Sequence, residues 1–319
     1  MKNGKHILVT GGAGFIGAHL VERLLKDGKS VVVIDDLSTG SRDNLRAVAQ
    51  NKNFRFIQTK ISAFAELPEL AANSEFIFHL AATVGVELVV KSALHVLEAS
   101  FNETQILLRA AAKNSTPILF TSTSEVYGKS AKPEFSEDDD LLIGPPGQSR
   151  WSYACSKLTD EFLALAYARE KNLPVTIARL FNTVGPRQTG RYGMVLPRFI
   201  SAAKNNEPLR VFGDGAQSRC FCLVHDVVEA LVRLQKSDAA RGEIFNIGGT
   251  EEISILELAK LVVATLGSKS VIELIPYDQA YAPGFDDMRR RKPLVEKLER
   301  CVNFKPQTTL REIIRLTAG

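Results

Sequence analysis

The sequence predicts an α/β fold built on a doubly wound parallel sheet, with a smaller substrate-binding region at the C-terminal end. Short, continuously apolar runs alternate with helix-length amphipathic stretches up to about residue 182. The first apolar run leads directly into a glycine-rich turn, and after residue 183 the predicted elements become shorter. Apolar strands separated by helices indicate a parallel sheet that is covered on both faces.

Six β-rich runs are predicted to form the strands of this sheet, and helical periodicity fills the gaps between them. The strands are 6–10 (HILVT), 30–35 (SVVVID), 54–59 (FRFIQT), 76–81 (FIFHLA), 117–122 (PILFTS) and 174–180 (PVTIARL). The helices are predicted at 14–27, 93–113 and 152–171. Right-handed crossovers between parallel strands would then place helices on both sides of the sheet.

The alternation of apolar strands with amphipathic helices ends at the Gly/Pro/Arg-rich stretch GPRQTGRYGMVLP. We therefore expect residues 1–182 to form the sheet domain and residues 183–319 a smaller region, some of whose segments return to the main sheet. A helix near 195–204, a strand at 209–212 and a helix near 224–236 are predicted there.

Composition excludes several classes of protein. Of the 319 residues, 45% are hydrophobic and 24% charged, which is typical of a soluble domain. No apolar run approaches the roughly 20 residues that span a bilayer, and the N-terminus lacks a signal-peptide layout. The net charge of +4 comes without a dense basic run, so we expect neither nucleic acid nor membrane as a partner. A cytoplasmic location is the expectation.

The four cysteines are expected to be reduced thiols. Cys220 and Cys222 form a C-x-C pair that could suggest a metal. Alternation along a strand explains the pair better, because no second ligand pair follows at the spacing of a zinc site. We predict no metal.

The glycine-rich turn is a candidate dinucleotide-binding site. Gly11, Gly14 and Gly17 follow a strand and open a helix. Glycine permits the tight turn, lets the backbone approach a pyrophosphate and lets the helix pack on the strand, as in the Rossmann motif. The free N–H groups of the helix N-terminus then face the phosphates. A flexible loop is the alternative for glycines taken alone.

Asp35 ends the second predicted strand and favours NAD. Its carboxylate is placed to hold the adenosine ribose hydroxyls and to repel the additional phosphate of NADP. Arg42 lies close enough in sequence to keep NADP open.

Tyr153 and Lys157 form a candidate acid/base couple. Tyrosine, with a free pKa near 10, is a poor base at neutral pH. A lysine one helical turn away lies on the same face and stabilises the phenolate, so that the tyrosine can take a hydroxyl proton while hydride leaves for NAD. The same spacing also suits the start of an ordinary amphipathic helix.

Together these motifs resemble the extended short-chain dehydrogenase/reductase family of nucleotide-sugar enzymes. TGGAGFIG, HLAA, STSEVYG, YACSK, RLFNTVGPR, VFGDG and RCFCLVHD occur in the family's order along nearly the whole chain. The resemblance implies an NAD-dependent enzyme acting on a UDP-sugar. The cofactor-binding residues it implies are Gly11, Gly14, Phe15, Ile16, Gly17, Asp35, Leu80, Ala81, Ala82, Tyr153 and Lys157.

The resemblance also implies the catalytic and substrate-binding residues. Thr123, Glu125, Tyr153 and Lys157 are the expected catalytic set, with Thr123 assisting oxidation at carbon 4 of the sugar. The arginines of MRRRKP have two interpretations. One of them reaches the nucleotide phosphates, or the stretch is a solvated basic turn. The expected substrate-binding residues are Ser124, Asn182, Arg187, Arg219 and Arg290.

Ser124 and Glu125 bear on the reaction that follows oxidation. The 4,6-dehydratases that act on thymidine-linked sugars carry Asp-Glu at these positions, and the Asp gives a proton to the leaving hydroxyl. Ser124 replaces that Asp here, so this dehydration lacks its expected acid. Ser-Glu is similar to UDP-glucuronate decarboxylases and GDP-mannose dehydratases. A 4-ketone is β to the glucuronate carboxylate, so oxidation alone activates loss of carbon dioxide. We therefore expect a UDP-glucuronate decarboxylase. A UDP-glucose or UDP-glucuronate 4-epimerase is the first alternative and an NDP-sugar 4,6-dehydratase the second. A redox-sensing protein without catalysis is a further alternative. Without a structure, Glu125 could also be a solvated carboxylate at a strand end.

The predicted helices at 93–113 and 152–171 carry apolar stripes that include Leu94, Leu97, Phe101 and Phe162. Such stripes are most often core. In the family that the chain resembles, the corresponding helices pair with their copies in a four-helix bundle. The resemblance therefore implies a homodimer.

Overall fold

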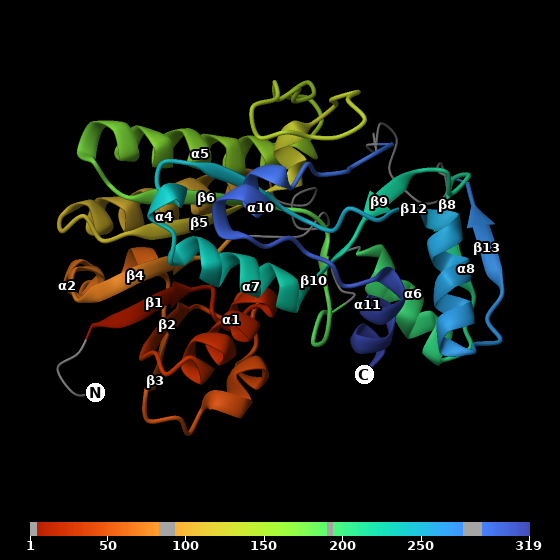
Figure 1. Cartoon of the computed structure of the whole chain (residues 1–319), viewed down its shortest axis with the longest axis horizontal. Helices are drawn as coiled ribbons and strands as arrows, with labels where there is room; N and C mark the ends of the chain where they lie inside the picture. The colour runs from red at the N-terminus through yellow and green to blue at the C-terminus, as the bar shows by residue number, and fades with distance from the viewer. Residues whose placement is uncertain (1–4, 83–92, 190–193, 277–288) are drawn as a thin grey trace.

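Seven parallel strands form one central sheet, in the order β11-β6-β5-β4-β1-β2-β3 (Figure 1). The computed structural model describes residues 5–82, 93–189, 194–276 and 289–319. The strand order reverses between β1 and β4, which opens a crevice at the carboxyl ends of the strands. The predicted doubly wound sheet is confirmed. Its strands are β1 His6–Thr10, β2 Val31–Asp35, β3 Phe54–Gln58, β4 Ser74–His79, β5 Ile118–Thr123, β6 Val175–Leu180 and β11 Ile244–Ile247.

The central strands are buried on both faces, as their continuous apolar runs predict. All residues of β1 and β2 are buried. The largest difference from prediction is β4, which begins at Ser74 beside His6 and ends at His79. The next three residues, 80–82, leave the strand and line a cavity. The predicted apolar run is therefore longer than the strand, because its last residues line the cavity.

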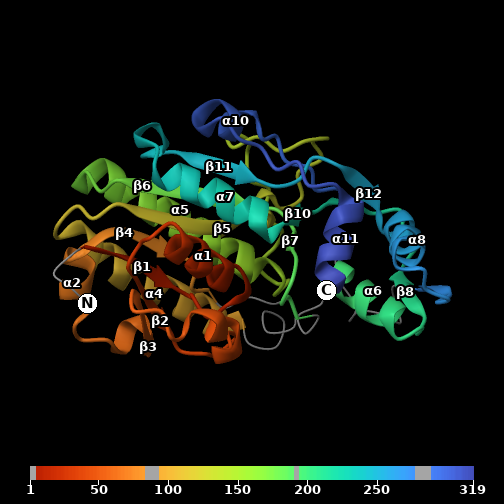
Figure 2. The same cartoon turned by 60° about the horizontal axis from the view of Figure 1, so that its bottom comes forward.

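Helices cover both faces of the sheet (Figure 2). One face carries residues of α1, α7 and α10, which share a core with β1 and β2. The opposite face carries α2, α4 and α5. The bounds of these helices are α1 Phe15–Lys26, α2 Leu67–Ala72, α4 Ala93–Ala112, α5 Trp151–Lys171, α7 Val224–Gln235 and α10 Glu296–Val302.

A separate apolar core holds the C-terminal region together. Three helices pack around the parallel pair of β8 and β13, and two further strand pairs lie between this core and the sheet. These elements are α6 Val195–Lys204, α8 Ile255–Leu266, α11 Leu310–Ala318, β8 Leu209–Phe212, β13 Ile272–Ile275, β9 Ser218–Cys220, β12 Glu252–Ser254, β7 Thr183–Val184 and β10 Cys222–Leu223. Short 3-10 turns complete the described chain at η1 Arg42–Val48, η2 Ile61–Ala63, η3 Ser124–Tyr127 and η5 Asp238–Ala240.

Three elements that follow residue 183 in sequence lie in the sheet or against it: α7, β11 and α10. The predicted helix at 224–236 is α7, which packs with α1 on one face of the sheet. The strand β11 was not predicted, because only four residues form it, and it extends the sheet beside β6. The chain thus passes through the C-terminal region, returns to the sheet at α7 and β11, leaves for α8 and β13, returns at α10 and ends in the C-terminal region at α11.

A buried ion pair fixes α5 against the sheet. Arg179 on β6 donates from Nη2 to Glu161 Oε2 at 2.7 Å, and both side chains are 3% exposed. Ser122 at the end of β5 also hydrogen-bonds Glu161, and Arg179 Nη1 donates to the Tyr127 hydroxyl at 3.0 Å. This network holds the middle of α5 beside the ends of β5 and β6.

Candidate active site

A cavity of about 1000 Å³ opens at the carboxyl ends of the strands. This volume lies at the upper end of the range for ligand pockets, enough for two ligands to lie together. Its walls combine sheet residues with residues from α5, β9 and α6. The sequence-predicted residues that line it are Gly11, Gly14, Phe15, Ile16, Gly17, Asp35, Leu80, Ala81, Ala82, Thr123, Ser124, Glu125, Tyr153, Lys157, Asn182, Arg187 and Arg219.

The turn after β1 has the close backbone contacts that only glycine permits. Gly11 has a φ of +73°, and a Cβ atom there would lie 2.6 Å from the Ala81 backbone nitrogen. A Cβ atom on Gly17 would lie 2.2 Å from the Gly11 carbonyl oxygen. The N-cap of α1, Gly14, has no side-chain cap, so the first N–H groups of the helix face the cavity unblocked. This cradle fits the diphosphate of a dinucleotide.

Asp35 is held in place by the same turn. Its Oδ2 accepts a hydrogen bond of 2.9 Å from the Ala13 backbone N–H, and its Oδ1 accepts one of 2.8 Å from Leu37 N–H. Burial raises the pKa of this carboxyl, and the two N–H donors oppose that rise. Arg42 instead donates to Gln58 at 2.7 Å and lies over the Phe56 ring. A carboxylate at the cavity wall with its nearby arginine engaged elsewhere fits NAD better than NADP.

Tyr153 and Lys157 lie in the first turns of α5 and meet Thr123 from the end of β5. The Tyr153 pKa is raised above its usual value, mainly by burial and then by the Glu125 carboxylate, while a hydrogen bond with Thr123 lowers it. Lys157 is 2% exposed, and its Nζ lies 3.9 Å from the centre of the Phe120 ring. Burial lowers the Lys157 pKa. The two side chains and Thr123 form a compact proton-transfer group.

Glu125 lies between two arginines at the cavity wall. Arg291 Nη2 is 2.6 Å from Glu125 Oε1, and Arg150 Nη2 is 3.5 Å from Oε2. The three side chains are 10%, 21% and 12% exposed for Arg291, Glu125 and Arg150. Glu125 is therefore a paired carboxylate within the site rather than a solvated one.

The arginines of MRRRKP lie on different sides of the cavity wall. Arg290, the residue predicted to bind substrate, lies outside the cavity, with its side chain 46% exposed and paired with Glu252. Its neighbour Arg291 lines the cavity instead. Alternation along extended backbone sends adjacent side chains to opposite sides, so the sequence indicated an arginine in this stretch but could not select the register. Arg150, in front of the Tyr-x-x-x-Lys pair, was also missed.

The remaining predicted substrate residues differ in their surroundings. Arg219 on β9 is buried and donates to the Ser218 carbonyl at 2.8 Å. Asn182 donates to the Cys220 carbonyl at 2.8 Å, which ties the end of β6 to β9. Arg187 forms a fork on Glu22 of α1, with distances of 2.7 and 3.0 Å. In the structure Arg187 therefore joins its loop to the cofactor side of the cavity.

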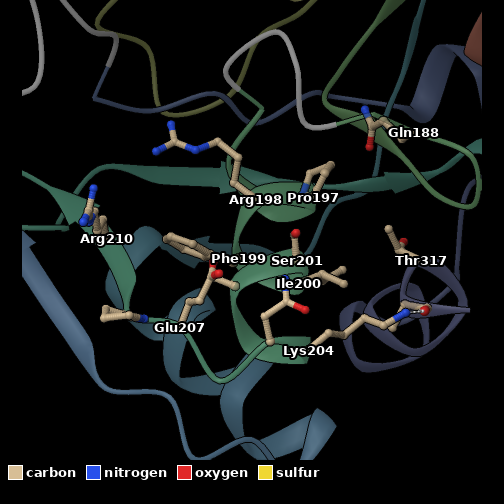
Figure 3. Close-up of a pocket in the computed structure, with 14 residues that line it drawn as sticks. Gln188, Pro197, Arg198, Phe199, Ile200, Ser201, Lys204, Glu207, Arg210 and Thr317 are labelled. Carbon is tan, nitrogen blue, oxygen red and sulfur yellow. Dashed lines mark hydrogen bonds between the residues drawn. The ribbon is translucent and has the colours of Figure 1, made fainter.

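A second hollow of about 910 Å³ is lined by α6, the start of β8 and the end of α11 (Figure 3). Lys204 closes one side by donating to the Ala318 carbonyl at 2.6 Å. Pro197, Arg198 and Phe199 line both this hollow and the large cavity. The hollow is thus a neighbour of the large cavity across α6.

Cys220 and Cys222 lie buried on successive short strands and are free thiols. Burial raises the pKa of both, so the reactive thiolate is disfavoured. In the ranges that the structure covers, no three His, Cys, Asp or Glu side chains cluster as metal ligands. None of the described helices is both long and apolar enough to cross a bilayer.

Comparison with known proteins agrees with this geometry. Residues 7–248 match the NAD dependent epimerase/dehydratase family. The chain is 41% identical to a UDP-N-acetyl-alpha-D-glucosaminuronate decarboxylase from Bacillus cytotoxicus, over 98% of this chain and 96% of that protein. It is 34% identical to UDP-glucuronic acid decarboxylase 2 of Arabidopsis thaliana, over 98% of this chain and 67% of the relative.

A solved structure has the same fold. The UDP-glucuronic acid 4-epimerase from Bacillus cereus, in complex with UDP-glucuronic acid and NAD, superposes with a TM-score of 0.87. The two sequences are 30% identical, over 98% of each chain. Given the glycine cradle, the placement of Asp35 and these matches, the chain belongs to the NAD dependent epimerase/dehydratase family of extended short-chain dehydrogenases/reductases and uses NAD as its cofactor.

Proposed function

We propose that the protein is a decarboxylase of a UDP-linked uronate, which it oxidises at carbon 4 before carbon dioxide is lost. The observation that carries the proposal is Glu125 between Arg150 and Arg291, at the same wall as Tyr153 and Thr123. Two guanidinium groups beside the proton-transfer group suit a sugar that carries its own carboxylate. The decarboxylases from Bacillus cytotoxicus and Arabidopsis thaliana support the same reaction.

Oxidation at carbon 4 is the first step. Bound NAD supplies the hydride acceptor and later the hydride donor. Tyr153 removes the proton of the 4-hydroxyl as hydride leaves the carbon, and Thr123, hydrogen-bonded to Tyr153, orients that hydroxyl. The form of Tyr153 that accepts this proton is the phenolate, which Lys157 stabilises with its ammonium charge, and the transfer leaves Tyr153 as a neutral phenol. The product is a 4-ketone.

Loss of carbon dioxide follows from the position of the ketone. The bond between carbon 5 and the carboxylate breaks, its electron pair forms an enolate on the 4-keto group, and carbon dioxide leaves. Arg291 and Arg150 hold the carboxylate before it leaves, and Glu125 keeps the two guanidinium groups apart and oriented. Tyr153 and Thr123 stabilise the enolate oxygen by hydrogen bonding. Carbon 5 then takes a proton that comes from solvent. Hydride returns to carbon 4 and the proton held by Tyr153 returns to its oxygen, which completes the cycle to the UDP-pentose.

The nature of the substituent at carbon 2 is the open element of the substrate. The 41% identical relative is named for an N-acetylglucosaminuronate and the plant relatives for glucuronate. We propose the 2-acetamido uronate as the first choice because of the higher identity, with UDP-glucuronate as the second.

A 4-epimerase is the alternative reaction. The Bacillus cereus 4-epimerase also takes UDP-glucuronic acid, and its fold matches over nearly the whole chain. An epimerase would return hydride to the opposite face of the ketone and retain the carboxylate. The two reactions therefore differ in product mass.

The experiment is incubation of the purified protein and NAD with UDP-N-acetylglucosaminuronate, UDP-glucuronate and UDP-glucose in separate reactions. We expect carbon dioxide from at least one uronate and none from UDP-glucose, measured by trapped carbon dioxide and by mass spectrometry of the nucleotide products. An isomer of unchanged mass without carbon dioxide would replace the decarboxylase by the epimerase. The Tyr153→Phe protein is the control for contaminating activity.

We further propose a homodimer in which α4 and α5 pair with their copies as a four-helix bundle. Leu94 and Phe162 are 69% and 64% exposed, and Leu97 and Phe101 are about 40% exposed on the same two neighbouring helices. Apolar side chains this exposed on one face mark an interaction surface. Light scattering should give a dimer for the natural chain and a monomer for Leu94→Asp combined with Phe162→Asp. A dimer in the double variant would contradict this interface.

The domain division at residues 182 and 183 remains a proposal, in which α7 and β11 come from the second region yet complete the sheet. A cytoplasmic location also remains a proposal, which cell fractionation tests.

A further inference from the structure

A buried carboxylate lies behind the acid/base couple and has no role in the steps above. Asp160 is on α5, nearly one turn beyond Lys157, and its side chain is fully buried. Its Oδ2 lies 3.9 Å from Lys157 Nζ and accepts a hydrogen bond of 2.8 Å from the Ser100 hydroxyl on α4. The carboxylate therefore bridges the catalytic lysine and the neighbouring helix.

The pKa of the Asp160 carboxyl is raised overall, and three neighbouring groups oppose that rise. Burial raises its pKa, whereas the Lys157 ammonium and the hydroxyls of Ser100 and Thr104 lower it. Thr104 in turn meets His79 Nε2 at 3.2 Å. Burial lowers the pKa of His79 to about 3, so this imidazole is neutral and adds no charge. The contact with Lys157 and the hydroxyl donors are therefore the interactions that favour the charged carboxylate in this buried cluster.

We propose that Asp160 is a positioning residue that holds the Lys157 ammonium and offsets part of its charge, so that Tyr153 keeps its proton to a higher pH than with the lysine alone. The inference rests on the proposed role of Tyr153 and Lys157 as the acid/base couple. In this arrangement the carboxylate sets the pH at which the enzyme begins to turn over, without touching substrate.

The charged groups that face Tyr153 and Lys157 change the pKa values of both side chains. Burial and the Glu125 carboxylate are the larger causes of the raised Tyr153 pKa, and Asp160 adds to them. Asp160 also raises the pKa of Lys157, against burial. Removal of one buried negative charge therefore eases the loss of a proton from the couple, whichever of the two side chains releases it. The titratable and charged groups around the couple are Asp160, Glu161, His79 and Glu125, with Arg150 and Arg291 paired to Glu125.

The test is titration of Tyr153 in the NAD-saturated protein, followed by carbon-13 NMR of ring-labelled tyrosine. The chain has six tyrosines, and the spectrum of Tyr153→Phe identifies the signal of Tyr153. Asp160→Asn removes the charge and keeps the shape and the hydrogen bond to Ser100. Glu170→Gln is the matched control, since it removes the same charge from an exposed position on the same helix.

We expect the midpoint of the Tyr153 titration to fall by about one pH unit in Asp160→Asn, and the acid limb of the pH–rate profile to move with it. The control should titrate as the natural chain does. An unchanged or higher midpoint in Asp160→Asn overturns the proposal. Asp160→Ser serves the same test if the asparagine protein does not fold.

The NMR titration requires no substrate, so it separates this proposal from the proposed function. A lower midpoint in a protein that decarboxylates no UDP-uronate would contradict the decarboxylase and leave the role of Asp160 supported. Carbon dioxide release together with an unchanged midpoint would support the decarboxylase and contradict the role of Asp160.

Discussion

The two walls of the cavity are built in different ways. The cofactor wall consists of residues that immediately follow sheet strands, such as Gly11 after β1, Asp35 at the end of β2 and Thr123 at the end of β5. The substrate wall takes Arg219 from a strand of three residues and Arg291 from a stretch near the C-terminus. One wall follows from local pattern, and the other depends on how distant segments meet. The comparison teaches that the sequence predicts the cofactor wall more completely than the substrate wall, where it indicated Arg219 but not Arg291.

The largest expected effect tests the group that joins the two walls. Tyr153→Phe removes the phenol oxygen, so turnover should fall by about a thousandfold, within the range for loss of a general acid/base. NAD binding should stay within about threefold, because the glycine cradle and Asp35 are untouched. Titration calorimetry with NAD measures this affinity. Turnover that survived in this variant would remove Tyr153 from the mechanism.

The second effect tests the substrate wall. Arg291→Met should reduce turnover of a UDP-uronate by about a hundredfold, because Glu125, left with only the 3.5 Å contact to Arg150, then faces the substrate carboxylate. Arg290→Met is the matched control. It removes an exposed ion pair with Glu252 and should change turnover by less than about threefold. Equal losses in the two variants would show that the cavity does not distinguish these neighbours.

Arg290 and Arg291 show which part of the site could not be predicted from the sequence. The strands, the glycine turn and Asp35 were predictable because continuous burial and strand-to-helix turns leave local signatures. The choice between Arg290 and Arg291 was not, since it depends on the register of a short extended segment that no long periodic pattern fixes. The strand β11 was not predicted for a related reason. Four residues are too few to show periodicity, and only pairing with β6 makes them a strand.

Arg150 and Asp160 flank the predicted Tyr153 and Lys157 and yet were not singled out. Both lie on or beside a helix where charged residues are ordinary. Their roles appear only when η3 brings Glu125 to Arg150 and when α4 brings Ser100 to Asp160. These contacts join segments 25 and 60 residues apart. A helix pattern in one sequence does not contain that information.

A smaller effect tests the cofactor wall. Asp35→Ala should weaken NAD binding by about tenfold, which corresponds to loss of about 1.4 kcal/mol of hydrogen bonding to the ribose. Affinity for NADP should fall less or rise, because the repelling carboxylate is gone. Titration calorimetry with both cofactors measures the ratio. A change of equal size for NAD and NADP would mean that Asp35 supports the turn through Ala13 and Leu37 without discriminating between them.

The smallest effect asks whether the two walls belong to separately stable units. Ser254 caps α8 in the C-terminal region, where its hydroxyl accepts a hydrogen bond of 3.2 Å from Glu257 N–H. Ser254→Ala should cost about 1 kcal/mol of stability, the usual cost of losing such a cap. Because α8 packs in a core that shares no residues with those of the sheet, hydrogen exchange should quicken in α6, β8 and α8 while β1 and β5 keep their protection. Ser41→Ala, which removes a comparable cap in η1 on the sheet side, should leave exchange in the C-terminal region unchanged. Uniform loss of protection in Ser254→Ala would instead make the molecule one cooperative unit, in which the substrate wall cannot open without the cofactor wall.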